Sequence, residues 1–115
     1  MTTYFGFAIS DSMFVGDCTI NRRVLSIKEV LNLVHVKNFV SCCNPSHKAT
    51  INAMQSRFGI KNIPIPESPP RVEIIRGDSI IVMGVRGLPR LTDRHEYTSE
   101  EIEKATFSFS IYEVK

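Results

Sequence analysis

Residues 106–114 read TFSFSIYEV, and this stretch decides how the rest of the chain is interpreted. Phe107, Phe109 and Ile111 alternate with polar or amphipathic side chains. A period of two places one set of side chains on each face of a β-strand, so the stretch predicts a strand with one buried apolar face. A strand of this kind needs neighbouring strands and a covering layer, and the upstream residues supply candidates for both.

Several upstream segments have the composition of strands. Tyr4 to Ile9 (YFGFAI) is apolar almost throughout, which is typical of a strand covered on both faces. Arg71 to Arg76 (RVEIIR) and Ser79 to Arg86 (SIIVMGVR) flank the turn-forming pair Gly77-Asp78, so we expect a hairpin there. Residues 18–20 (CTI) indicate a short edge strand.

The sequence contains three helix-start signals. Residues 26–29 (SIKE) and 98–101 (TSEE) both have the capping-box pattern. In this pattern the first residue's hydroxyl accepts from the backbone amide of the glutamate, and the glutamate carboxylate accepts from the backbone amide of the first residue. Asn44 followed by Pro45 predicts a third start, and Gly59 is a suitable end for that helix. The order of elements predicts an α/β (α+β) fold, in which residues 1–115 form a single domain with a mixed sheet of about five strands flanked by helices.

The composition narrows the class of protein. With 43% hydrophobic residues and a net charge of +2, the chain is typical of a globular domain, and no DNA binding is expected from so mild a charge. No apolar run has membrane-spanning length and no leader is evident, so we expect no membrane partner and a cytoplasmic location. The three cysteines show no metal-ligand spacing, and neither a metal nor a cofactor is expected.

His47 is the first candidate for chemistry. It falls within the first turn of the helix that Asn44 and Pro45 begin, where free amides and the helix dipole suit a phosphate. An imidazole in that place is suited to proton transfer. The alternative is a surface histidine on a well-capped helix. Ser10 and Ser12 follow the first strand, where pockets form beyond the carboxyl ends of parallel strands; alternatively they only terminate it.

Arginines are the second set of candidates. Arg86 ends a predicted strand, and Arg90 and Arg94 lie in or next to the loop beyond it. Guanidinium groups bind phosphate oxygens in a two-pronged geometry. The alternative is a solvated surface in which these arginines pair with nearby carboxylates such as Asp78 and Asp93.

Nearly the whole chain resembles a known family, the small viral ring nucleases that act as type III anti-CRISPR proteins. The resemblance is carried by residues 4–14 (YFGFAISDSMF), 24–30 (VLSIKEV) and 39–59 (FVSCCNPSHKATINAMQSRFG). Arg71-Val72-Glu73, Gly77-Asp78, Arg90-Leu91 and a closing Phe-x-x-Tyr-Glu-Val follow in the family's order. The chain departs from the family at Pro45-Ser46, where Ile-Gly is usual, and at Phe7, where the family has asparagine.

The resemblance implies a homodimer, or a higher homo-oligomer, that holds a cyclic oligoadenylate across a two-fold cleft. It implies metal-independent cleavage, in which a ribose 2′-hydroxyl attacks the adjacent phosphate and His47 protonates the leaving oxygen. In one alignment of residues 86–93, Arg90 matches a phosphate-binding arginine and Asp93 a catalytic glutamate; in the other, neither has a match. A viral origin would place the protein in the host cytoplasm.

The functional expectation is therefore an anti-defence protein that binds a cyclic nucleotide messenger and cleaves it. The alternative is a non-catalytic sponge for a cyclic nucleotide or an ADP-ribose-derived signal. The expected catalytic residues are His47 and Asp93. The expected ligand-binding residues are Ser10, Ser12, Asn44, Ser46, Thr50, Arg86, Arg90 and Arg94.

Overall fold

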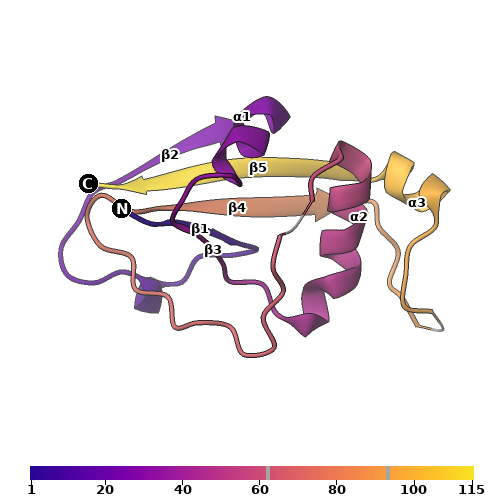
Figure 1. Ribbon diagram of the computed structural model, residues 1–115, viewed down its shortest axis with the longest axis horizontal. Coiled ribbons are helices and arrows are strands. Elements are labelled where there is room, and N and C mark those ends of the chain that lie inside the picture. The colour runs from indigo at the N-terminus through magenta and orange to yellow at the C-terminus, as the bar shows by residue number, and fades with distance from the viewer. Residues whose placement is uncertain (62, 93) are drawn as a thin grey trace.

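The structure is a computed structural model that describes residues 1–61, 63–92 and 94–115. Its strands are β1 (Thr3–Gly6), β2 (Ile20–Leu25), β3 (Phe39–Ser41), β4 (Ser79–Arg86) and β5 (Thr106–Val114). Its helices are α1 (Ile27–Leu33), α2 (Lys48–Phe58) and α3 (Ser99–Lys104), with 3₁₀ turns η1 (Asp11–Met13) and η2 (Pro45–His47). The predicted α+β fold, with a mixed sheet of five strands and helices packed against it, is confirmed (Figure 1).

The strand order in the sheet is β2-β5-β4-β1-β3. The central strand β1 runs parallel to both β3 and β4, whereas β5 is antiparallel to β4 and to β2. The carboxyl ends of β1, β3 and β4 therefore meet at one edge of the sheet. Helix α2 stands at this edge, at the end where β4 terminates (Figure 1).

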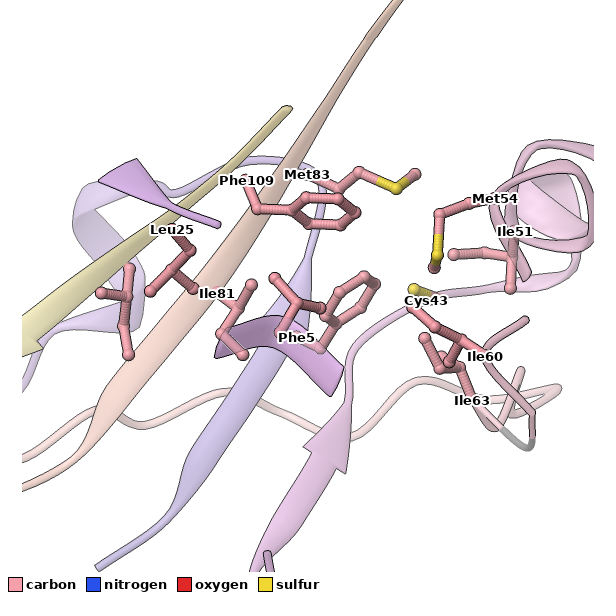
Figure 2. Packing of buried hydrophobic residues seen from close by; sticks show 12 residues of the cluster. Phe5, Leu25, Cys43, Ile51, Met54, Ile60, Ile63, Ile81, Met83 and Phe109 are labelled. Carbon is pink, nitrogen blue, oxygen red and sulfur yellow. The ribbon is translucent and has the colours of Figure 1, made fainter. Parts of the chain in front are cut away.

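One face of the sheet carries the main core. Phe5, Ile81 and Phe109 project from three different strands and are almost entirely buried. Ile51 and Met54 of α2 point toward them and complete the cluster (Figure 2). Each apolar side chain of this size contributes about 1.5–3 kcal/mol when it is fully buried, so this contact fixes α2 firmly against the sheet.

The opposite face has a smaller core, and here one prediction is wrong. Residues 71–76 do not form a hairpin with β4. Instead, Ile74 makes an isolated parallel bridge to Phe14: its N–H donates to the Met13 carbonyl at 2.6 Å and its own carbonyl accepts from the Val15 N–H at 3.2 Å. The covered residues beneath include Ile80 and Val114.

The reason is that β4 already has a partner on each side, β1 and β5, and no free edge is left for a hairpin. The Asp78 carboxylate then directs the chain away from the strand. It accepts hydrogen bonds from the Thr2 N–H at 2.8 Å and the Ile75 N–H at 3.2 Å, and it is buried. These two bonds fix the turn before β4 so that the segment crosses the sheet face.

Two strand boundaries also differ from expectation. Strand β1 ends at Gly6 rather than Ile9. Strand β2 shares only Ile20 with the predicted residues 18–20 and pairs with β5 from Ile20 to Leu25. The middle of β2 is polar because it lies at the sheet edge, where Arg22 donates to the Ser110 hydroxyl at 2.9 Å. The three-residue strand β3 was not predicted.

The local helix signals are confirmed. Ser26 with Glu29 and Thr98 with Glu101 both form complete capping boxes, and Gly59 ends α2 in the left-handed conformation with φ of 67°. Across the described ranges, every helix falls short of the length and apolar character that a transmembrane span requires.

Candidate functional site

The candidate site lies where the chain leaves β1 and β3. The Cys42 N–H donates to the Phe5 carbonyl at 2.8 Å, which holds the two exits side by side. As a result Phe7, just past β1, reaches His47, and the two rings pack in a tilted arrangement with centroids 4.2 Å apart and an interplanar angle of 37°. The parallel pairing of β1 and β3 thus joins residues that are 40 positions apart in the sequence.

His47 is held at the junction of η2 and α2. The Asn44 N–H donates to Nδ1 of the imidazole at 3.5 Å, a long bond that assigns Nδ1 as the acceptor. In the neutral ring the proton then lies on Nε2. Since Phe7 covers one ring face and Nδ1 faces the backbone, the Nε2 edge is the part of this half-buried ring left for a ligand.

The free amides expected at this helix start are not free. The Ser46 N–H donates to the Asn44 side-chain oxygen at 3.0 Å, and the His47 N–H donates to the Asn44 carbonyl at 2.9 Å. The Lys48 N–H donates to the Pro45 carbonyl. The tight 3₁₀ turn pairs the His47 and Lys48 amides with carbonyls three residues back, and the Asn44 side chain takes the Ser46 amide. Phosphate binding is then left to side chains and the helix dipole.

A cleft of about 430 Å³ lies beside η2, between α2 and the loop that follows β4. Its lining includes Ser46, Lys48 and Asn52 from the helix side, and Arg94 and His95 from the loop. The Glu96 carboxylate also lines the cleft and opposes an anion there. The part next to Lys48, at the helix start, is the part suited to a phosphate group.

Arg94 is largely committed to the fold. Both of its terminal nitrogens contact the Glu101 carboxylate at 2.5 Å. This hydrogen bonding, with a further bond from the Thr98 N–H, lowers the pKa of Glu101 to about 2. Arg94 therefore anchors the start of α3. Its positive charge is largely neutralised by Glu101, so it attracts an anion in the cleft only weakly.

The two predicted serines lie in a different cleft. Ser10 and Ser12 line a space of about 350 Å³ together with Cys42 and Arg71, and their hydroxyl oxygens are 3.1 Å apart. Burial raises the pKa of the Cys42 thiol to about 11, so this sulfur stays protonated near neutral pH. Cys43 is fully buried in the core.

The remaining predicted residues are not gathered into one place. Thr50 is half-buried in the first turn of α2, while Arg86 at the end of β4 and Arg90 in the loop beyond it are exposed. Asp93 lies outside the described residues. Of the predicted residues that the structure describes, only Ser46 and Arg94 line the first cleft and only Ser10 and Ser12 line the second.

Sequence reasoning missed three residues that the structure places at the site. Phe7 was noted only as a departure from the family, and neither Lys48 nor Asn52 was singled out. Asn52 lies one turn beyond Lys48, so the helical period from the predicted start at Asn44 was the signal that could have found it. Among the described side chains, no three histidines, cysteines or carboxylates gather as a metal site would require.

No protein-family model matches this sequence, and no curated protein matches it. A solved structure does match: B116 of Sulfolobus turreted icosahedral virus (STIV), which is 17% identical in sequence. The match covers 98% of this chain and 99% of that chain, with a TM-score of 0.71. The two proteins therefore share a fold over nearly their whole lengths.

Proposed function

We propose that this protein is a viral anti-defence protein that binds a cyclic nucleotide second messenger and opens its ring without a metal. The resemblance to viral ring nucleases supports this proposal. The fold shared with B116, a protein of an archaeal virus, is consistent with a viral origin. The ligand we propose is a cyclic oligoadenylate.

The observation that carries the proposal is the mounting of His47. Its ring packs against Phe7 and accepts from the Asn44 N–H at Nδ1, and its chain neighbours Ser46 and Lys48 line the cleft. In the proposal Nε2 is the nitrogen that meets the leaving oxygen, as a general acid requires. Lys48, the next residue, supplies a positive charge for the phosphate.

The proposed reaction transfers no group to the protein. A ribose 2′-hydroxyl attacks the adjacent phosphorus and loses its proton to solvent, and the bond to the 5′-oxygen breaks. His47 enters the step as an imidazolium, gives that 5′-oxygen a proton and is left as the neutral imidazole. The products carry a 2′,3′-cyclic phosphate at one end and a 5′-hydroxyl at the other, so no water is consumed. Arg90 as a phosphate ligand and Asp93 as a second catalytic group remain part of the proposal.

The proposed assembly is a homodimer. A cyclic oligoadenylate with two-fold symmetry is matched by a site that repeats about a two-fold axis, and each copy would present one His47 to the ring.

The test is incubation with a panel of cyclic nucleotides, followed by chromatography of the free and heat-denatured fractions. Wild-type protein should convert cyclic tetra-adenylate to linear products. His47→Ala should retain binding and lose about 10²–10⁴ of the turnover rate. His35→Ala, an exposed histidine after α1, is the matched control. Wild-type turnover in His47→Ala would overturn the mechanism, and binding of no ring at all would overturn the function.

A non-catalytic sponge is the second candidate, and one observation favours it. With the amides of Ser46, His47 and Lys48 already bonded internally, the turn offers few backbone donors to stabilise charge on a reacting phosphate. A sponge would release intact ligand on heat denaturation, whereas a ring nuclease would release linear product.

A further inference from the structure

Arg57, near the end of α2, binds the end of α3 from outside that helix. Its Nη1 donates to the carbonyls of Ile102 at 2.9 Å, Glu103 at 2.7 Å and Ala105 at 3.4 Å. The last carbonyls of a helix have no donor within the helix, and they carry the negative end of its dipole. A guanidinium group satisfies both conditions, so Arg57 caps α3 although it belongs to a different helix.

The carbonyls that Arg57 binds lie on both sides of the junction between α3 and β5. Ile102 and Glu103 belong to α3, whereas Ala105 leads into β5 with an extended backbone, at φ of −74° and ψ of 148°. The left-handed residue that ends α2 at Gly59 has no counterpart at this junction. Since one nitrogen bonds both the helix and the residue after it, Arg57 fixes the angle at which α3 meets the strand.

Packing between α2 and α3 is incomplete beside these hydrogen bonds. A space of about 140 Å³ is lined by Ala49 and Ala53 of α2 and by Ile102 of α3. Side chains that face a space lose part of the dispersion attraction that holds two packed helices together. The hydrogen bonds from Arg57 compensate for this loss, so the angle between the two helices depends on them.

The other end of α3 holds one wall of the cleft beside η2. Both terminal nitrogens of Arg94 contact the Glu101 carboxylate at 2.5 Å, and Arg94 lines the cleft together with Lys48 of α2. Helix α3 has six residues, so a tilt of about 20° at Ala105 would displace its far end by about 3 Å. The position of the loop wall relative to Lys48 therefore depends on Arg57.

We propose that Arg57 is a positioning residue, which sets the distance between the two walls of this cleft and through it the affinity for the ligand. Arg57 is not among the described residues that line the cleft, so it acts through α3. Without its hydrogen bonds the ligand would have to order the loop wall on binding, and ordering costs affinity. The ligand is the cyclic oligoadenylate of the proposed function, on which this part of the inference rests.

The test replaces Arg57 with methionine, which keeps the unbranched apolar stem and removes the donors. We expect Arg57→Met to raise the dissociation constant of cyclic tetra-adenylate about tenfold, as the loss of one charge-assisted hydrogen bond would. The single-turnover cleavage rate at saturating ligand should stay within about twofold of wild type, because proton transfer is left to His47. Arg76→Met is the matched control, since Arg76 also donates to a backbone carbonyl, that of Asp17 at 2.9 Å, beside the start of β4.

NMR spectra of the ¹⁵N-labelled full-length protein give a reading that needs no ligand. The backbone amides of Arg94 and His95 should shift in Arg57→Met and stay in place in Arg76→Met. Unshifted amides, an unchanged dissociation constant, or an equal loss of affinity in the control would overturn the inference. A loss confined to the cleavage rate would also overturn it, because Arg57 would then act on the chemistry and not on the cleft.

Failure of the proposed function is a separate outcome. If the wild type binds no ring, the proposed ligand is wrong, and the amide shifts still decide whether Arg57 holds the cleft wall. If the wild type binds the ring and both amides stay in place in Arg57→Met, only the inference about Arg57 fails.

Discussion

The starts of α1 and α2 both have a capping-box arrangement, yet the residue three positions after the cap is a glutamate in one and a histidine in the other. At α1 the Glu29 N–H donates to the Ser26 hydroxyl at 3.2 Å, and the Ser26 N–H donates to the Glu29 carboxylate at 3.1 Å. At the other start, Asn44 accepts from the turn that follows it, and His47 occupies the place that Glu29 has in α1. Both starts are capped, but only one uses a carboxylate.

Glu29 and His47 contribute differently to the stability of their helix starts. A carboxylate in the first turn is stabilised by the helix dipole, and Glu29 gains more from Arg23, whose hydrogen bond lowers the pKa of this carboxyl. A histidine at the same place contributes less stability to the helix, since the hydrogen bond from the Asn44 N–H to its Nδ1 is long at 3.5 Å. The α2 start therefore gives up some stability, and under the proposed function it gains a proton-transferring group in exchange.

The largest effect is expected from making the two starts alike with His47→Glu. The turnover of cyclic tetra-adenylate should fall by about 10²–10⁴, because the general acid is removed. Unfolding free energy should change by less than about 1 kcal/mol, because the new carboxylate gains from the helix dipole while the ring contact with Phe7 is lost. Single-turnover cleavage and urea unfolding measure the two quantities.

Glu29→His is the reciprocal control. It should lower stability and leave turnover unchanged, since α1 has no part in the proposed site. If His47→Glu destabilises the protein as much as Glu29→His does, the two starts are equivalent and the comparison fails.

The next effect is expected from removing each cap. Ser26→Ala and Asn44→Ala should each cost about 0.5–2 kcal/mol of unfolding free energy, the usual range for an N-cap residue. Only Asn44→Ala should also lower turnover, because its side chain holds the turn that carries His47. Denaturant unfolding with a parallel cleavage assay separates the two outcomes. An equal loss of turnover in both variants would show that helix stability alone controls activity.

A smaller effect is expected at Phe7, which supports His47 as Arg23 supports Glu29. Phe7→Leu keeps an apolar side chain and removes the aromatic face, so it should cost about 0.5–1.5 kcal/mol beyond any change in buried area. The His47 ring resonances should shift and broaden in NMR spectra, while those of His35 stay in place. Unchanged His47 resonances would mean that Phe7 does not hold the ring.

The two helix starts also show which parts of the fold can be predicted from the sequence alone. Both capping boxes, the Asn44 cap and the Gly59 end depend on residues a few positions apart, so local chemistry was enough to predict them. The predicted hairpin of residues 71–76 with β4 was wrong because β4 pairs with β1 and β5 instead. That pairing depends on residues far away in the sequence. Strand β3 is only three residues long, which is too short for any periodicity to be visible.

The site was predicted in part for the same reason. The place of His47 followed from the helix start, and its chemistry remains a proposal. The occupied amides were missed because a 3₁₀ turn and an α-helix begin with the same residues. The separation of Ser10 from Arg94 could not be predicted, since it depends on how the loops after β1 and β4 leave the sheet.

The smallest effect is a local loss of protection in acid. The pKa of Glu101 is lowered from an ordinary value near 4.5 to about 2, chiefly by Arg94 and also by the Thr98 N–H. A lowered carboxyl pKa contributes stability above the unfolded value, and that contribution is lost as the pH falls from about 4.5 toward 2. The Thr98 amide at the α3 start should therefore lose hydrogen-exchange protection over this window, relative to Ser46, whose acceptor is the non-titrating Asn44 amide. Parallel loss at both amides would show that the whole domain unfolds in acid, and a flat Thr98 profile would show that the Arg94 pair does not form.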